Sequence, residues 1–182
     1  MLVLKQYSGE YVLKLTDFGY STQYTADDQL TYIPISHPWN APEHTRYLQK
    51  WTLADAKSMD FFSFSMMSLW FLFNEQLLRL SNTTEPEPEN IRSLGESYYK
   101  TDKSVYVLLK SKELKALPEL ALKVIDIERN KTILRDKASK ASSQPYDVAA
   151  VESLSELFDE WEAVLCEQLQ DNPSERPLPE IE

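Results

Sequence analysis

Glycine, cysteine and histidine are all scarce in this chain of 182 residues. The three glycines, Gly9, Gly19 and Gly95, stand too far apart to build a phosphate-binding loop of the GxGxxG or P-loop type. The single cysteine, Cys166, permits no internal disulfide, and two histidines do not complete a four-ligand Cys/His zinc site. We therefore expect a protein of a reducing, intracellular compartment, most simply the cytoplasm.

The chain also lacks a hydrophobic run long enough to cross a membrane. Its most apolar stretch, residues 59–73, has fifteen residues, which as a helix cover roughly 22 Å against about 30 Å of hydrocarbon. The first ten residues show neither a long apolar run nor the cleavage site of a signal peptide. We expect no membrane partner, and we interpret residues 58–73 as a buried central helix wrapped by other elements.

Basic residues are almost absent near the C-terminus. Residues 151–182 carry ten acids and one base, Arg176, whereas residues 1–150 are nearly neutral and the whole chain has a net charge of -10. This balance argues against nucleic acid as a partner. Residues 100–140 are the exception, with eleven bases and six acids. Such a stretch is typical of a solvated helix face, and the alternative is a face that docks another protein.

Hydrophobic patterning in the first half of the chain predicts a short N-terminal β-hairpin followed by helices. Residues 2–5 and 11–16 are short runs rich in Val, Leu and Tyr, and Gly9 between them can supply the positive φ of a turn. Residues 19–40 have no sustained period and are expected to form an extended, irregular loop. A short helix is expected over residues 42–50.

The second half of the chain, in contrast, alternates helical patterns with polar linkers. Residues 81–146 are interpreted as a proline-containing linker at 81–90, helices at 103–109 and 119–134, and a second linker at 138–146. Residues 147–170 predict an amphipathic helix, and residues 178–182 are a polar tail. The helix should bury one stripe of apolar residues at intervals of three and four, namely Val148, Val151, Leu154, Leu157, Phe158, Trp161, Val164, Leu165 and Leu169.

Four short motifs follow one another in an informative order. Asp17-Phe18-Gly19 follows a predicted strand, and Ala41-Pro42-Glu43 comes 26 positions later, counted from Asp17 to Glu43. Asp60 lies at the start of the apolar helix, and Arg176 lies in the segment SERP near the end of the chain. Together these motifs make residues 1–177 resemble the C-terminal lobe of a eukaryotic-type protein kinase domain, a mainly α-helical fold.

The resemblance implies a nucleotide site and a segment that docks the substrate. Asp17, with Phe18 packed behind it and Gly19 after it, would coordinate the Mg²⁺ that bridges the phosphates of ATP. Residues 19–43 would be the activation segment. Within it, Ser36 and Trp39 would lie where a protein substrate docks, and the activity would be phosphorylation of protein Ser or Thr hydroxyls.

The resemblance also implies structural roles for three residues. Glu43 would pair with Arg176 in a mostly buried, bidentate ion pair, since the planar guanidinium matches both carboxylate oxygens. Asp60 would hold the backbone of the catalytic loop. No catalytic residue is assigned within the chain, because the base of that loop would precede Met1 by family spacing.

The sequence departs from the family pattern at both ends. It contains no glycine-rich loop, no VAIK-like lysine motif and no HRDxxxxN catalytic loop, and the final helix of the lobe is missing. We expect a lobe truncated at both ends that transfers no phosphate on its own. Two alternatives stay open. One is a catalytically inactive, kinase-like module that binds a partner protein, and the other is an acidic helical domain in which the motifs are accidents.

Overall fold

The structure, a computed structural model, describes residues 2–5, 9, 11–14, 19, 21–46, 48–81, 102–141 and 148–177. Within these ranges the fold is mainly helical and begins with an antiparallel two-stranded sheet, which confirms the predicted class at this level. The elements in chain order are β1 (Leu2–Lys5), β2 (Tyr11–Lys14), β3 (Thr31–Tyr32), β4 (Lys50–Trp51), α1 (Leu53–Ser81), α3 (Lys103–Glu113), α4 (Leu117–Ala141), α5 (Val148–Gln168) and the 3₁₀ turn η2 (Pro173–Glu175).

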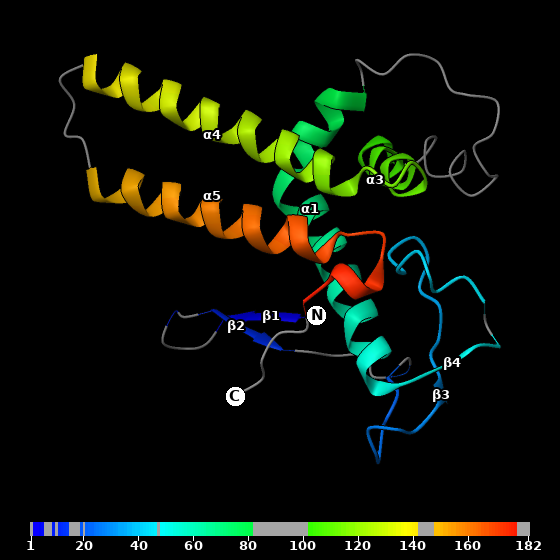
Figure 1. The fold of residues 1–182 in the computed structure, drawn as a ribbon. Coiled ribbons are helices and arrows are strands. Elements are labelled where there is room, and N and C mark those ends of the chain that lie inside the picture. The colour runs from blue at the N-terminus through cyan, green and yellow to red at the C-terminus, as the bar shows by residue number, and fades with distance from the viewer. Residues whose placement is uncertain are drawn as a thin grey trace.

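The helix α1 is the longest element, and the other helices pack against it. In Figure 1, α4 and α5 lie side by side and cross α1, and α3, which is seen nearly end-on, also packs against α1. Buried aliphatic and aromatic side chains from α1, α3, α4 and α5 form one core. Within the described ranges, no helix combines the length and the apolar character that a membrane crossing requires.

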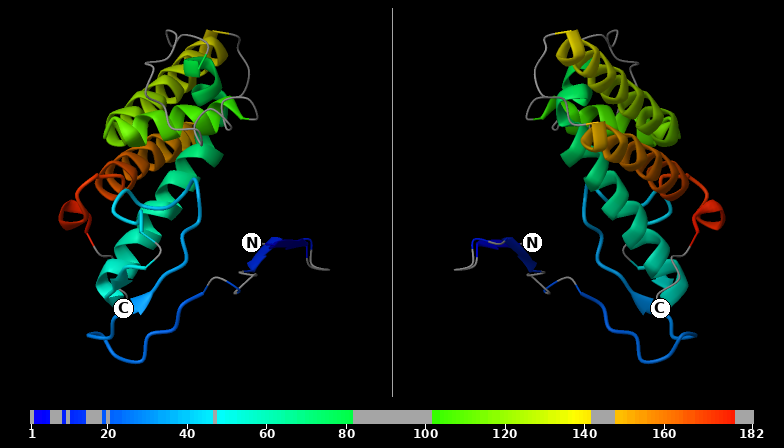
Figure 2. Two further views of the ribbon diagram at one scale, coloured as in Figure 1. Left: turned by 90° about the vertical axis from the view of Figure 1, so that its right-hand side faces the viewer. Right: turned by 90° about the vertical axis from the view of Figure 1, so that its left-hand side faces the viewer.

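The predicted N-terminal hairpin is present. β1 and β2 pair antiparallel in a register that runs from Leu2 opposite Lys14 to Lys5 opposite Tyr11. Gly9, between the strands, has a φ of +88°, a conformation that glycine adopts without steric cost. Both views of Figure 2 show the hairpin lying apart from the helices.

Two side chains define the start of α1 through a reciprocal pair of hydrogen bonds. The Thr52 hydroxyl oxygen accepts from the Asp55 backbone N–H at 3.2 Å, and the Asp55 carboxylate accepts from the Thr52 N–H at 3.1 Å. The Thr52 hydroxyl also donates to that carboxylate at 2.7 Å. This arrangement is a capping box, which satisfies N–H groups that a helix end leaves without partners.

Replacing Thr52 with alanine should lower the free energy of unfolding by about 1 kcal/mol, because the cap is lost. Thr45 is exposed and outside any helix, so Thr45→Ala is the matched control and should change little. Urea denaturation of the two variants measures the difference. Equal stabilities would show that the cap does not hold the start of α1.

The expectation that other elements wrap α1 on all sides is wrong. Its buried residues recur every three or four positions on one side, which faces α3, α4 and α5. The opposite side carries an apolar row, the α1 stripe, in which Phe64 is 60% exposed, Phe71 is 76% exposed and Met67 is 40% exposed. The helix also begins before and ends after the predicted bounds of 58–73, and non-helical angles at Phe73 kink it.

Two further expectations about the helices need correction. Residues 138–141 are the last turn of α4 and not part of a linker, in keeping with the good helix formers Ala and Lys among them. On α5, Leu154 and Val164 of the predicted buried stripe are exposed. The contacts of α5 with α4 and α1 bury a narrower face, which includes Phe158 and Leu165.

The short helix expected at residues 42–50 is not present in the described residues of that range. They form turns and then β4, which pairs with β3. Tertiary hydrogen bonds hold this conformation, because Asn40 Nδ2 donates to the His44 carbonyl at 3.0 Å and His44 Nε2 donates to the Ile33 carbonyl at 3.1 Å. The irregular course predicted for residues 19–40 is found in the described residues, apart from β3.

Candidate functional site

Two predicted site residues that are far apart in the sequence, Glu43 and Arg176, meet in a buried ion pair. Arg176 Nη1 donates to Glu43 Oε1 at 2.6 Å, and Arg176 Nη2 donates to Glu43 Oε2 at 3.0 Å. The Arg176 side chain is 0% exposed and that of Glu43 is 16% exposed. The bidentate pair expected between these residues, 133 positions apart, is therefore present in the fold.

The Arg176 guanidinium also donates to two backbone carbonyls. Its Nε donates to the Gln170 carbonyl at 2.7 Å, and Nη2 donates to the Asp171 carbonyl at 3.1 Å. The guanidinium carbon lies 4.6 Å from the ring centroid of Phe62 on α1, a cation–π contact. Arg176 thus joins three parts of the chain, namely the residue after Ala41-Pro42, the end of α5 and the core face of α1.

The local sequence places Arg176 correctly at the end of η2. Asn172 caps this short turn, because its side-chain oxygen accepts from the Ser174 N–H at 3.1 Å and from the Ser174 hydroxyl at 2.9 Å. Pro173 occupies the first position of the turn, where a missing N–H costs nothing. Asparagine, proline and serine in this order therefore fix the backbone from which the guanidinium extends.

Ser36 and Trp39, the residues predicted to dock a substrate, share one tight turn, the 36–40 turn. The Ser36 carbonyl accepts from the N–H groups of Trp39 and Asn40, both at 3.0 Å. Ser36 is exposed, whereas Trp39 is partly buried with its ring centroid 5.6 Å from that of Trp70 on α1. Of these two residues, Ser36 offers the more accessible side chain.

The 36–40 turn is also held by a residue that the sequence patterns did not single out. Lys112, on α3, donates from Nζ to the Pro38 carbonyl at 2.6 Å and to the Asn40 carbonyl at 3.0 Å. Burial lowers the pKa of Lys112 from 10.5 to about 8, and the nearby Glu113 opposes that shift. A signal was present in the sequence, because Lys112 continues the apolar spacing of Val105, Leu108 and Leu109 onto the buried face of α3.

Asp60 is the predicted site residue that lies on α1. It is exposed on α1, yet crowding by protein atoms desolvates the carboxylate enough to raise its pKa, and the charge of His44 opposes the shift. No hydrogen-bond donor to this carboxylate lies among the described residues. The role expected for Asp60, holding a catalytic loop, stays a prediction.

The nucleotide-binding triplet is described only in its last member. Gly19 is exposed, and Asp17 and Phe18 lie outside the described residues. Among the residues that are described, no group of three or more His, Cys, Asp or Glu side chains could hold a metal ion. The described part of the chain therefore does not by itself form the Mg²⁺ site implied for Asp17.

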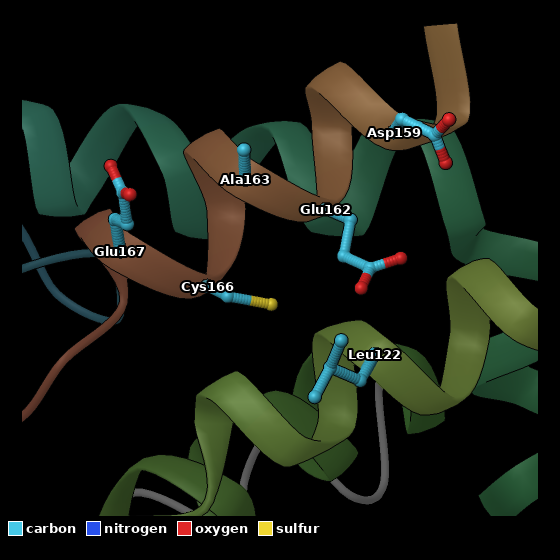
Figure 3. A pocket seen from close by; sticks show the side chains of 6 residues that line it. All are labelled: Leu122, Asp159, Glu162, Ala163, Cys166 and Glu167. Atoms are coloured by element: carbon cyan, nitrogen blue, oxygen red, sulfur yellow. The ribbon is translucent and has the colours of Figure 1, made fainter. Parts of the chain in front are cut away.

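A separate open groove of about 370 Å³ lies between α4 and α5 (Figure 3). Cys166 points into it, and burial together with the carboxylates of Glu162, Glu119 and Glu167 raises the pKa of its thiol to about 11. Glu162 is already bound by Arg129, whose Nη2 donates to it at 2.9 Å. A thiol that stays protonated at neutral pH is a poor nucleophile, so this setting does not activate Cys166 as one.

In comparisons with known proteins, no family model, no curated protein and no solved structure matches this chain.

Proposed function

We propose that this chain is the C-terminal lobe of a protein kinase domain and takes part in the ATP-dependent phosphorylation of Ser or Thr hydroxyls in a protein substrate. The observation that carries the proposal is the bidentate pair of Glu43 and Arg176. Neither residue has a local reason to meet the other. The resemblance to a kinase lobe predicts that the two motifs carrying these residues meet. If the motifs were accidents, no contact between Glu43 and Arg176 would be expected.

The ion pair of Glu43 and Arg176 has a structural role in the proposed lobe. It fixes the end of the proposed activation segment, residues 19–43, to the core through the contact of Arg176 with Phe62. The 36–40 turn immediately precedes this anchor, so the exposed Ser36 is held at a constant place on the surface. A protein substrate that docks there is positioned by the fold, and positioning is a large part of catalysis of phosphoryl transfer.

The groups that act directly on the phosphates are mostly absent from the sequence. Asp17 is the proposed Mg²⁺ ligand, and bound MgATP would supply the transferred phosphoryl group. Without a catalytic base, a phosphate-binding lysine motif or a glycine-rich loop, the 182 residues lack what neutralises and orients that group. The chain alone is therefore proposed to be inactive.

A chimera tests the proposal. The N-terminal lobe and catalytic loop of an active kinase are joined ahead of Met1, and transfer of labelled phosphate from MgATP to a pool of Ser- and Thr-containing peptides is measured. Transfer is expected for the chimera and should be abolished by Asp17→Ala, while the chain alone should show none. A chimera that unfolds cooperatively and binds MgATP but transfers no phosphate would contradict the proposal.

The second candidate is a protein-interaction module without phosphotransfer. The α1 stripe favours it, because Phe64, Met67 and Phe71 expose large apolar side chains in a row, and such surfaces often mark protein interfaces. The inactive but folded outcome of the chimera would select this candidate. Changing Phe64 and Phe71 together to serine should then abolish binding to the partner without unfolding the chain.

A further inference from the structure

The contacts of Lys112 join α3 to the 36–40 turn across more than seventy positions of sequence. Its Nζ donates to the carbonyls of Pro38 and Asn40 at 2.6 and 3.0 Å, and these are the residues on either side of Trp39. We propose that Lys112 is the positioning residue of this turn, holding it from α3 so that Ser36 and Trp39 stay in place for a docking substrate. The docking step rests on the proposed function, whereas the holding of the turn does not.

The charged groups near Lys112 do not compete with the Pro38 and Asn40 carbonyls for its ammonium group. Glu113 is its neighbour on α3, and among the described residues it is the acid whose charge acts appreciably on Lys112. Lys115 and Asp171 line the same small gap but bind each other at 2.8 Å. Glu43 is bound by Arg176. Among the described residues, no carboxylate forms an ion pair with Lys112.

The desolvated ammonium makes the closed turn sensitive to pH. When the turn opens, the Lys112 amine regains water and its ordinary pKa of 10.5, whereas in the closed turn the pKa is about 8. The open form therefore binds the proton more tightly between these two values, so closure is favoured as the pH rises through this window. The gain should approach about tenfold per pH unit above pH 8, with little change below it.

Amide hydrogen exchange of Trp39 and Asn40 measures closure, because both N–H groups donate to the Ser36 carbonyl. Protection relative to the unfolded chain should rise about fivefold between pH 8 and pH 9 in the native protein. Lys112→Met removes the donor and the titrating group, so protection should fall at pH 7 and become independent of pH. Lys112→Arg keeps donors but does not titrate, so it should restore much of the protection with a flat profile.

The control variant is Lys110→Met, on the same helix but with no contact to the turn in the described residues. It should leave both the protection and its pH profile unchanged. A pH profile in Lys112→Met that matches the native one, or Lys112→Arg that protects no better than Lys112→Met, would overturn the positioning role. If Lys112→Met loses amide protection throughout the helices, the variant has a folding defect. The test then rests on Lys112→Arg, which should protect the 36–40 turn with no dependence on pH.

Binding of the Ser- and Thr-peptide pool separates this inference from the proposed function. Weaker binding by Lys112→Met, restored by Lys112→Arg, supports positioning for docking. Equal binding by all variants overturns it. If the native chain binds no peptide but its 36–40 turn shows the expected pH profile, the proposed docking fails, while the holding of the turn by Lys112 stands.

Discussion

Replacing Arg176 with alanine is expected to destabilise the protein by about 3–5 kcal/mol, the cost of leaving one partner of a buried ion pair alone. The Arg176 side chain is 0% exposed, and its loss would leave the Glu43 carboxylate and the carbonyls of Gln170 and Asp171 without donors. Glu43→Ala should cost a similar amount, because it leaves the guanidinium buried without its counter-charge. Chemical denaturation monitored by circular dichroism measures both values.

The double variant should lose far less than the sum of the two single losses, since removing both partners leaves no buried charge. Arg79→Ala is the matched control. Arg79 forms a 2.6 Å ion pair with Glu75 on the surface of α1, where both side chains are largely exposed, and its removal should change stability little. Additive losses at Glu43 and Arg176, or a control that is as damaging, would show that the pair does not anchor the segment.

Phe73→Ala is expected to cost about 3–5 kcal/mol, whereas Phe71→Ala, two positions away, should be nearly neutral. Phe73 is 1% exposed, and its ring lies edge-on to that of Trp161 on α5, with 5.6 Å between the ring centroids. Its truncation would leave a cavity where α1 meets α5. Phe71 belongs to the α1 stripe and is 76% exposed.

Comparing these two variants tests which face of α1 is buried. Both changes remove the same ring from α1, so the difference in the free energy of unfolding reports mainly how each ring is packed. Thermal denaturation should show a clearly lower Tm for Phe73→Ala only. A loss at Phe71 equal to that at Phe73 would mean that the α1 stripe is covered in solution, for example by a second copy, and the loss would then depend on protein concentration.

Local patterns in the sequence predicted the elements that local interactions determine. Short runs rich in Val, Leu and Tyr, with Gly9 between them, were enough to predict the hairpin, and the spacing of three and four was enough for α5. The turn at residues 42–46 could not be read in this way. Its backbone is fixed by hydrogen bonds between Asn40, His44 and Ile33, and no local pattern reveals those contacts.

The candidate site and α1 also depend on contacts between distant residues, which leave no local pattern in the sequence. The pairing of Glu43 with Arg176 was predictable only through the resemblance, because the two residues share no local pattern. Lys112 lies in the basic stretch of residues 100–140, whose composition is typical of a solvated helix face. Residues 59–73 are apolar all round, so their composition could not reveal that partners cover one side only and leave Phe71 exposed.

The distance along the chain between Glu43 and Arg176 has a consequence for biosynthesis. At about 5–20 residues per second, a ribosome needs roughly 7 to 27 s to add the 133 residues that separate them. During that time the Glu43 carboxylate has no buried partner, and Lys112 is available to the 36–40 turn well before Arg176 is. The turn can therefore close against α3 first, and its anchor to the core can form only after Arg176 has been synthesised.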